Sequence, residues 1–286
     1  METVKTLGVV GAGTMGAGIA QLAARNNIHV LLYDNQTDAV KSGLAKIRQR
    51  LTRALDREQI SRSDMERTMD NIEESSLEKF RDAEVVIEAV VEVMEVKKSV
   101  FRQLSDLVAP STILATNTSS FSITELAGVT QRPESVIGMH FFNPAPVMKL
   151  VELVRGEDTA DRTVEFAQHL AAQMNKETVV VRKDTPGFIV NRILMPLFIE
   201  AMRILEEGVA TQEDIDKAVK LGLNHPMGPL TLADFTGLDV DLEVMDYLYN
   251  EFHDDRFAAP QVLRRLVRAG HVGKKSGRGF YHYAPK

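Results

Sequence analysis

The sequence predicts an α/β domain built on a mostly parallel sheet, followed by an all-α domain. Short apolar runs alternate with helical segments from residue 6 to about residue 182, as the strands and helices of a parallel sheet do. A turn-forming break with the sequence KDTPG then covers residues 183–187. Helical patterns dominate beyond it. We therefore expect the α/β domain at residues 1–184 and the helical domain at residues 185–286.

Composition restricts the class of protein. Of the 286 residues, 44% are hydrophobic and 26% are charged, as in ordinary soluble globular proteins. The formal net charge of −6 disfavours a nucleic-acid binder or a membrane-surface binder. There is no cysteine, which excludes disulfides and thiolate chemistry and fits a reducing cytoplasm. No apolar run reaches membrane-spanning length and the first strand begins almost at once, so we expect a cytoplasmic protein without a signal peptide.

The first predicted strand leads into a glycine-rich turn. Thr6–Val10 is apolar, a helical segment follows the turn to about Asn26, and His29–Tyr33 is a second apolar run that ends in Asp34. Strand, glycine turn, helix, strand and acidic residue occur in the order of the dinucleotide-binding fingerprint, so we predict a Rossmann-type domain. The turn consists of Gly11, Ala12, Gly13, Thr14, Met15 and Gly16.

The residues of this turn have separate roles in the fingerprint. Gly11 makes the tight turn, Gly13 lets backbone amides approach a pyrophosphate, and Gly16 lets the helix pack against the sheet. Thr14 and Met15 open the helix, whose N-terminus supplies positive potential. We expect all five to bind the cofactor.

Asp34 indicates which cofactor is bound. It lies 18 residues after Gly16, where a carboxylate can accept hydrogen bonds from the adenosine ribose hydroxyls. The same charge would repel a 2′-phosphate, and the next two residues, Asn35 and Gln36, offer no basic side chain to receive one. The sequence therefore favours NAD over NADP.

Two further apolar runs continue the parallel pattern. Glu84–Val91 is apolar nearly throughout, as a strand buried on both faces should be, and it ends in Glu92. After a helical segment, Ile113–Ala115 leads to a polar cluster that includes Asn117 and Ser119. The ligand crevice of an open parallel sheet lies at the carboxyl ends of its strands, so we expect these three polar side chains to gather there.

A hairpin is predicted after this cluster. Gly138–Phe142 and Lys149–Val154 flank an Asn-Pro-Ala-Pro turn, and folding the chain about Pro146 sets His140 opposite Glu152, because 146 is midway between 140 and 152. A carboxylate that holds an imidazole fixes its tautomer and suits it to proton transfer near neutral pH. A structural histidine in a half-buried strand is the alternative, which the nucleotide fingerprint and the polar cluster disfavour.

A long charged stretch separates the second and third apolar runs. Within it Lys46, Arg50, Arg53 and Arg57 recur at intervals of 4, 3 and 4 residues, which places them on one face of a helix. A solvated helix face is the ordinary explanation. In an acidic protein with a nucleotide site, a one-sided basic face can instead hold a phosphorylated substrate handle.

The helical domain begins with an unusually apolar helix. Phe188–Leu205 is apolar on nearly every face, so it must be buried all round, and a domain of roughly 100 residues can bury it only with partners. Subunit contacts are therefore expected, with a tightly packed monomer as the alternative. Asn191 stands near the start of this helix as either a satisfied buried amide or a ligand contact. The sequence shows no metal-ligand spacing.

Seven motifs together resemble those of the L-3-hydroxyacyl-CoA dehydrogenases, in particular the short-chain, stand-alone bacterial members that act on 3-hydroxybutyryl-CoA. The resemblance runs from about Lys5 to Tyr283. It implies an NAD-dependent enzyme that reversibly oxidises an (S)-3-hydroxyacyl-CoA to the 3-oxoacyl-CoA and forms a homodimer through its helical domain. The motifs are GAGTMG, VVIEAVVE, ATNTSS, GMHFFNPAPVMKLVE, DTPGFIVNRIL, HPMGPLTLADFTGLD and GKKSGRGFY.

The resemblance also implies roles for individual residues. His140 would be the general base and Glu152 its orienting partner. Ser119 and Asn191 would contact the hydroxyl or carbonyl of the acyl group, and Asn143 would support the histidine and the cofactor. The basic helix with Lys46, Arg50 and Arg53 would meet the CoA. The side chains that would contact NAD are those of Asp34, Glu92, Lys97, Asn117, Ser119, Asn143 and Lys275.

Two other functions fit parts of this pattern. A β-hydroxyacid dehydrogenase acting on a small free acid or a sugar acid also pairs a nucleotide domain with a helical domain, but such enzymes commonly use a lysine base. The basic helix and the His140–Glu152 pair favour the acyl-CoA enzyme. An NAD-binding protein without turnover is the second alternative, which the joint presence of His140, Glu152, Ser119 and Asn191 disfavours.

Overall fold

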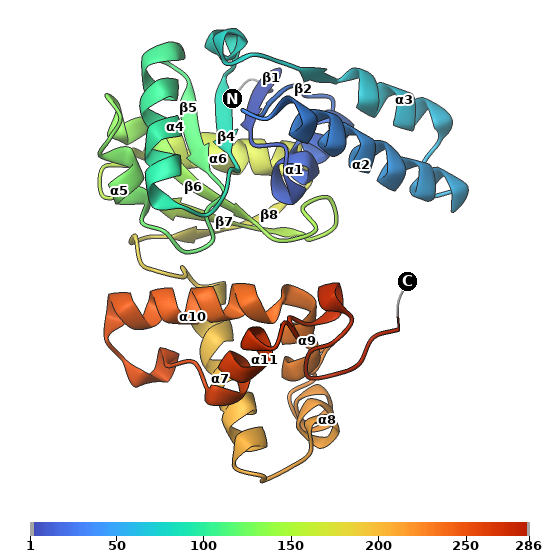
Figure 1. Ribbon diagram of the computed structural model, residues 1–286. Helices are drawn as coiled ribbons and strands as arrows, with labels where there is room; N and C mark the ends of the chain where they lie inside the picture. Colours follow the sequence, from blue (N-terminus) through green and yellow to red (C-terminus); the bar gives the residue numbers. More distant parts are fainter. Residues whose placement is uncertain (1–2, 285–286) are drawn as a thin grey trace. The chain divides into compact units, whose positions relative to one another are not determined.

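The chain forms two compact units. The computed structural model describes residues 3–284, so residues 1–2 and 285–286, the outer ends of the two predicted domains, lie outside the described part. One unit spans Met1–Thr185 and the other Pro186–Lys286. Strands and helices alternate in the first unit, and the second consists of helices (Figure 1). The predicted fold class, a Rossmann-type domain followed by an all-α domain, is thereby confirmed.

An eight-stranded sheet forms the centre of the first unit. Its order is β3-β2-β1-β4-β5-β6-β7-β8, and all neighbouring pairs are parallel except β6 and β7. The strand order reverses between β1 and β4, the position at which sheets of this type bind ligands. The strands are β1 (Thr6–Val10), β2 (His29–Tyr33), β3 (Ile72–Glu74), β4 (Val85–Glu88), β5 (Ile113–Thr116), β6 (Val136–Phe141), β7 (Leu150–Arg155) and β8 (Glu177–Val181).

Helices cover both faces of this sheet. Helices α1 (Thr14–Arg25) and α6 (Asp161–Gln173) pack on the face that carries Val9, Ile87 and Leu153. Glycines make room on the other face, since a Cβ at Gly138 would lie 2.9 Å from Ile123 of α5 (Ile123–Ala127). Helix α4 (Met94–Leu107) packs beside α5. Helices α2 (Thr37–Asp56) and α3 (Arg62–Asp70) contact each other and α1, and extend away from the sheet (Figure 1).

Two expectations about the strands are corrected. The apolar run Glu84–Val91 is a strand only as far as Glu88, and Val91 is 63% exposed. The chain has to leave the sheet there because it crosses the glycine turn, where a Cβ on Gly11 would lie only 2.5 Å from the carbonyl oxygen of Ala89. The edge strand β3 lies inside the long charged stretch and was not expected. It has three residues, too few for a pattern to form.

Five α-helices make up the described part of the second unit, and they enclose their own core. Phe198, Met202 and Leu248 are buried in it. The expectation that the first helix is buried on every face is wrong for the single chain, because Ile193 is 68% exposed. No helix within residues 3–284 is long and apolar enough to cross a membrane. The helices are α7 (Val190–Glu206), α8 (Gln212–Gly222), α9 (Pro229–Thr236), α10 (Leu238–Phe252) and α11 (Gln261–Arg268).

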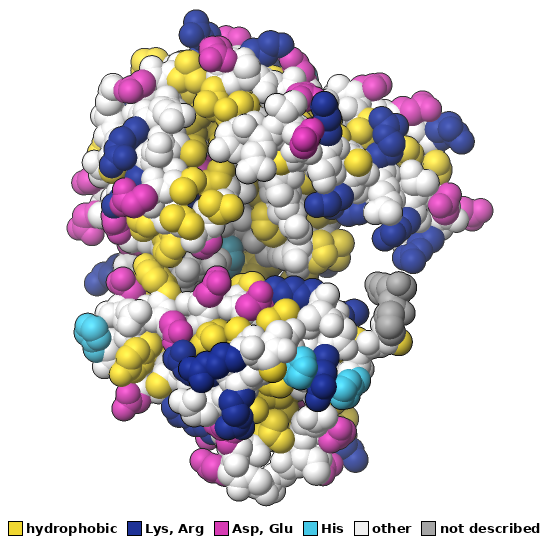
Figure 2. All heavy atoms as spheres, in the orientation of Figure 1, with side chains coloured by type: hydrophobic (Ala, Val, Ile, Leu, Met, Phe, Trp, Pro, Cys, Tyr) yellow, Lys and Arg dark blue, Asp and Glu magenta, His cyan; other side chains and the backbone are white. Residues whose placement is uncertain are grey.

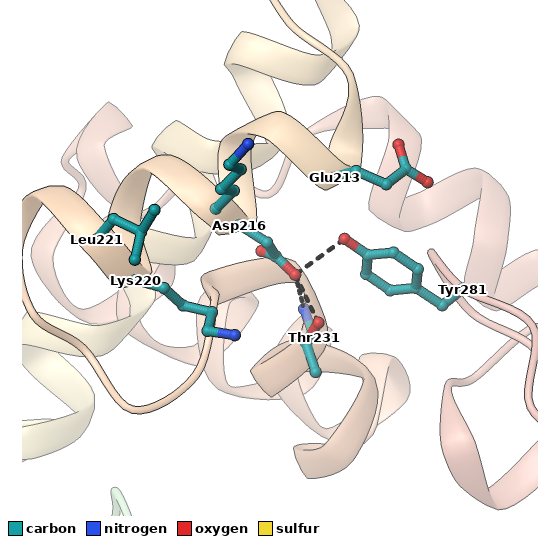
Figure 3. Close-up of a pocket in the computed structure, with 7 residues that line it drawn as sticks. Glu213, Asp216, Lys220, Leu221, Thr231 and Tyr281 are labelled. Atoms are coloured by element: carbon teal, nitrogen blue, oxygen red, sulfur yellow. Dashed lines mark hydrogen bonds between the residues drawn. The ribbon is translucent and has the colours of Figure 1, made fainter.

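Buried carboxylates hold the C-terminal segment onto these helices. Asp216 of α8 accepts a hydrogen bond from the backbone amide of Leu230 at 2.8 Å. It also accepts from the backbone amide of Thr231 and from the hydroxyl of Tyr281, both at 2.9 Å (Figure 3). Asp234 of α9 accepts a bond from the amide of Tyr281 at 2.9 Å. Each carboxylate thus joins segments that are distant in sequence, and the charge is compensated by several donors.

A third buried carboxylate makes the stability of this unit depend on pH. Burial raises the pKa of Asp241 from 3.8 to about 8, although Thr236 donates a hydrogen bond to it at 2.7 Å. In the unfolded chain the same group ionises near its ordinary pKa. Between these two pKa values the folded state holds a proton that the unfolded state lacks. The contribution of Asp241 to the free energy of unfolding is therefore fully present at lower pH and is lost as the pH rises from the lower pKa to the higher one.

Asp241→Asn should therefore gain stability over the wild type as the pH rises. Asparagine keeps the shape and an acceptor for Thr236 but cannot ionise, so the difference should grow by about 1.4 kcal/mol per pH unit inside the window. Thermal unfolding of both proteins at about pH 5 and about pH 8 measures it. Glu243→Gln, at an exposed position of the same helix, is the control and should show a constant difference. A constant difference for Asp241→Asn as well would contradict the assignment.

Candidate active site

The glycine turn between β1 and α1 has the shape that a dinucleotide requires. Gly11 has a φ of +102°, which favours glycine. A Cβ at Gly16 would lie 1.8 Å from the carbonyl oxygen of Gly11, so only glycine allows the helix to pack this closely. A Cβ at Gly13 would meet nothing within 4 Å, so the space beside Gly13 is open. The turn is closed on its protein side and open where a ligand would approach.

The N-terminus of α1 fits the pyrophosphate of NAD. No side chain caps this helix, and no acidic residue stands in its first turn. Its first amides are therefore available to an anion, which the helix dipole also favours. Thr14 and Met15 occupy the first two helical positions, as expected from the sequence.

Asp34 lies directly over this turn. Its Oδ2 accepts a hydrogen bond from the amide of Ala12 at 2.8 Å, and its Oδ1 accepts one from the amide of Gln36 at 3.0 Å. The carboxylate is thus fixed at the end of β2 beside the glycine turn and remains partly exposed. Together these residues form a cradle that fits the adenosine and pyrophosphate of NAD.

His140 and Glu152 form a buried pair across β6 and β7. The two strands are antiparallel and pair His140 directly with Glu152, which confirms the register expected from the midpoint at Pro146. The Nδ1 of His140 lies 2.7 Å from Oε2 of Glu152, and both side chains are buried. Because a carboxylate only accepts, Nδ1 is the donor, and Nε2 is the nitrogen that can take up a proton. The ring of Phe142 packs 4.4 Å from the imidazole ring, between centroids.

The loop that joins these strands is held by a lysine that sequence reasoning missed. Lys176 is buried, and its Nζ donates to the carbonyl oxygens of Ala145 and Met148 at 2.7 and 2.6 Å. Burial lowers the pKa of this ammonium. Asn143 lies in the same loop and precedes a cis peptide bond to Pro144. Nothing near Lys176 in the sequence indicates this contact, because its partners lie about 30 residues earlier.

Polar side chains meet at the carboxyl ends of β4, β5 and β6. Asn117 accepts a hydrogen bond from the amide of Phe141 at 2.9 Å through its Oδ1, so it joins the end of β5 to the end of β6. Glu92 accepts from the amide of Ser119 at 3.0 Å and from the hydroxyl of Thr118. The expected grouping of Glu92, Asn117 and Ser119 at this edge of the sheet is therefore present.

Lys97 is buried within this group. Its Nζ lies 2.8 Å from Oε1 of Glu88 and 3.0 Å from Oε2 of Glu92. Sequence reasoning missed Glu88, which is fully buried and stands at the end of β4. A glutamate inside an otherwise apolar run was the signal that could have revealed it, since a buried carboxylate has to be paired.

The basic residues of α2 are only partly as expected. Lys46 and Arg53 are exposed on the helix, but Arg57 lies just beyond its last residue. Arg50 is partly buried, and its Nε donates to Oε1 of Gln21 in α1 at 2.7 Å, so it also links two helices. Burial lowers the pKa of Arg50. Figure 2 shows Lys and Arg side chains over the α2–α3 projection, with acidic side chains among them.

Two predicted site residues belong to the second unit. Asn191 is in the first turn of α7. Lys275 donates to Asp239 at 2.7 Å, so its ammonium has a carboxylate partner within this unit. Their predicted contacts with the acyl group and with NAD remain predictions. Within residues 3–284, no group of three or more His, Asp or Glu side chains could hold a metal ion.

Comparison with known proteins identifies the family. Residues 6–185 match the model of the 3-hydroxyacyl-CoA dehydrogenase NAD-binding domain, and residues 187–283 match that of the C-terminal domain of the same enzymes. The chain belongs to the 3-hydroxyacyl-CoA dehydrogenase family. The resemblance seen in the sequence is confirmed, and with it the enzyme class, an NAD-dependent dehydrogenase, and the cofactor.

Relatives match over their full length. The chain is 46% identical to a probable 3-hydroxybutyryl-CoA dehydrogenase of Bacillus subtilis, with 99% of each chain covered. It is 45% identical to the 3-hydroxybutyryl-CoA dehydrogenase of Clostridioides difficile, covering 97% of this chain and 99% of the relative. The crystal structure of (S)-3-hydroxybutyryl-CoA dehydrogenase from Ralstonia eutropha superposes with a TM-score of 0.94 at 44% identity, covering 99% of this chain and 100% of that one.

A β-hydroxyacid dehydrogenase is a much weaker match. The 3-hydroxyisobutyrate dehydrogenase of Mycobacterium tuberculosis is 14% identical, with a TM-score of 0.62 over 93% of this chain and 94% of that one. This likeness shows a shared fold alone.

Substitutions at two glycines of this dehydrogenase should separate binding from folding. Gly13→Ala adds a methyl group that touches no protein atom, so we expect wild-type thermal stability but NADH affinity reduced about tenfold or more, because the methyl occupies the open space at the turn. Gly16→Ala, the matched variant, should lower the melting temperature because its methyl cannot fit beside Gly11. Thermal unfolding and NADH fluorescence titration measure both. A stable Gly13→Ala protein with unchanged affinity would place the dinucleotide elsewhere.

Proposed function

We propose that this enzyme catalyses the reversible oxidation of (S)-3-hydroxybutyryl-CoA to acetoacetyl-CoA with NAD. The buried His140–Glu152 pair carries this proposal, because it supplies a proton acceptor of fixed tautomer in the sheet that also forms the dinucleotide cradle. The relatives that match over their full length and are named for 3-hydroxybutyryl-CoA support the acyl group. Turnover of acetoacetyl-CoA with NADH by the purified protein is the direct test.

His140 acts as the base in the proposed mechanism. Its Nδ1–H is donated to Glu152, so its Nε2 accepts the proton of the substrate hydroxyl. NAD, which the glycine turn and Asp34 would hold, would supply the acceptor for the hydride from carbon 3. The imidazolium formed on His140 is stabilised by the carboxylate of Glu152, which keeps its hydrogen bond throughout. In the reverse direction the imidazolium returns the proton to the keto oxygen.

Other side chains orient the substrate and the cofactor in this proposal. Ser119 follows the Glu92-bound turn at the end of β5 and contacts the substrate oxygen, a role that we also propose for Asn191. Asn143 supports the histidine and the cofactor, and it lies in the loop to which Lys176 donates a hydrogen bond at the carbonyl of Ala145. For NAD we propose contacts with the glycine turn, Asp34, Glu92, Lys97, Asn117, Ser119 and Lys275.

The basic face of α2 would hold the phosphates of CoA. Lys46 and Arg53 are exposed on this helix, whereas Arg50 is partly committed to Gln21. Lysine and arginine side chains are the usual partners of phosphate. In this proposal the nucleotide handle of the substrate would bind a different element from the cofactor cradle.

We also propose that the enzyme is a cytoplasmic homodimer. The exposed Ile193 lies on α7, whose opposite face fills the core of the helical unit. Covering such an apolar face is what a subunit contact does. The absence of cysteine from the sequence fits a reducing compartment.

Replacing the two members of the buried pair should separate their roles. His140→Gln removes the base, so turnover of acetoacetyl-CoA should fall by about 10²–10⁴ while NADH still binds. Glu152→Gln keeps an acceptor for Nδ1–H but lacks the charge, so we expect a smaller loss of about tenfold or more. Steady-state rates and NADH titration measure these effects. Near wild-type turnover in His140→Gln would refute the mechanism.

The basic helix allows a second test, aimed at the CoA handle. Lys46→Ala combined with Arg53→Ala should raise the KM for acetoacetyl-CoA severalfold, because exposed charge contacts contribute only about 0.5–1 kcal/mol each, and the effect should shrink with added salt. Arg48→Ala, at an exposed position on the other side of the same helix, is the matched control. Arg50 is left unchanged because its loss would also disturb α1.

The KM for NADH should stay constant in these variants. A short acetoacetyl thioester without the nucleotide should be insensitive to them. Equal losses with both thioesters, or an equal loss in Arg48→Ala, would mean that α2 is a solvated or structural helix and that the phosphates bind elsewhere.

A further inference from the structure

Three ionisable side chains, two of them buried, form a chain of ion pairs at the carboxyl end of β4. Lys97 of α4 lies between Glu88 and Glu92, with N–O distances of 2.8 and 3.0 Å. Glu88 is fully buried and Lys97 nearly so, whereas the side chain of Glu92 is 37% exposed. Glu88 is the deepest member of the triad, and the proposed mechanism gives it no task.

Both carboxyl oxygens of Glu88 accept hydrogen bonds. Its Oε1 accepts from the amide of Val90 at 2.7 Å and from Lys97, and its Oε2 accepts from the hydroxyl of Thr116 at 2.7 Å. The hydroxyl of Thr116 also accepts from the amide of Thr118 at 3.2 Å, while its own hydrogen is donated to Glu88. Both oxygens therefore face donors, which is the environment of a carboxylate.

The triad as a whole carries one net negative charge. Burial by itself lowers the pKa of Lys97, but the charges and hydrogen bonds of Glu88 and Glu92 outweigh burial and raise it, so the ammonium is retained. One ammonium and two carboxylates leave a single excess negative charge. Because two of the three groups are buried, salt screens this charge poorly.

The position of the triad relates it to one half of the dinucleotide. Glu88 pairs with Val10 of β1 and with Thr116 of β5, so it stands at the point where the strand order reverses. Rossmann-type sheets bind one mononucleotide on each side of this point. Asp34, at the end of β2, belongs to the adenosine side. The triad therefore belongs to the side that receives the nicotinamide nucleotide.

We propose that Glu88 is a positioning residue that holds the Lys97–Glu92 pair under the nicotinamide half and gives it a net negative charge that favours the oxidised cofactor. The proposal rests on the NAD site described above. An oxidised nicotinamide ring carries a positive charge that the reduced ring lacks, so a fixed negative charge nearby binds the two forms with different strength. A merely structural Glu88 would affect both forms equally.

Glu88→Gln tests the charge, and Thr116→Val is its matched control. Glutamine keeps an oxygen for Val90 or Lys97, and Lys97 remains paired with Glu92, so the variant should fold. Valine at position 116 removes a hydrogen bond to Glu88 but leaves the charge of the triad intact. Dissociation constants for NAD⁺ and for NADH, measured by calorimetry on each full-length protein, give the ratio of affinities.

The ratio Kd(NAD⁺)/Kd(NADH) should rise about fivefold in Glu88→Gln and stay within about twofold of the wild type in Thr116→Val. An unchanged ratio in a folded Glu88→Gln protein, or an equal rise in Thr116→Val, would overturn the proposal. If Glu88→Gln fails to fold, Glu92→Gln is the second variant, because it removes one charge from the more exposed end of the triad. It should also raise the ratio Kd(NAD⁺)/Kd(NADH). An unchanged ratio in Glu92→Gln would likewise overturn the proposal. Wild-type turnover of acetoacetyl-CoA is scored separately, so failure of the substrate assignment is distinguishable.

Discussion

The antiparallel pairing of β6 and β7 is the constraint on which the proposed chemistry depends. All other strand pairs among the described residues are parallel, and this antiparallel pair sets His140 directly opposite Glu152. A shift of the register by one residue would turn His140 and Glu152 to opposite faces. The connecting loop also limits such a shift, because Lys176 holds its carbonyl groups and Ala145 packs against α1, where a Cβ at Gly18 would lie 3.3 Å from the Ala145 Cβ. The loop after the proposed base thus contacts the helix that fits the pyrophosphate of NAD.

The carboxyl ends of the central strands are held together by hydrogen bonds within the protein. Glu88 bonds to Thr116 between β4 and β5, and Asn117 bonds to the amide of Phe141 between β5 and β6. Buried polar groups of this kind are stabilising only when every partner is present. Moving one strand end would therefore break hydrogen bonds to its neighbours. Side chains at these ends thus hold their positions relative to the cofactor cradle. Such preorganisation is what a hydride-transfer site requires from its protein.

Much of this arrangement could be predicted from sequence, and the failures have physical causes. The glycine turn with Asp34 and the register of His140 with Glu152 follow from local spacing, since hairpins and fingerprints involve residues close in the chain. The end of β4 was predicted wrongly because Ala89, Val90 and Val91 stay apolar after the strand has ended. Lys176 was missed because its partners lie about 30 residues away in the sequence. Glu88 was missed because it stands inside an apolar run and its partner Thr116 is also distant in sequence. Arg57 follows the helical spacing, but α2 ends one residue before it. The contacts of Asn191 and Lys275 with ligands stay predictions, because each contact would involve a ligand that other elements also bind.

In the proposed mechanism, the buried carboxylates of Glu152 and Glu88 act on the two directions of the reaction in opposite ways. In this mechanism, oxidation of the alcohol puts a positive charge on the imidazole of His140, while NAD would lose the positive charge of its oxidised ring. Glu152 stands 2.7 Å from that imidazole and stabilises the charge that appears, whereas the triad of Glu88, Lys97 and Glu92 stabilises, in our proposal, the charge that disappears. With Glu152 alone, the bound equilibrium would be drawn towards the keto product. With the triad alone, it would be drawn towards the alcohol. Opposed in this way, the two negative charges keep the two bound states closer in energy, so neither direction of the reaction is strongly uphill on the enzyme.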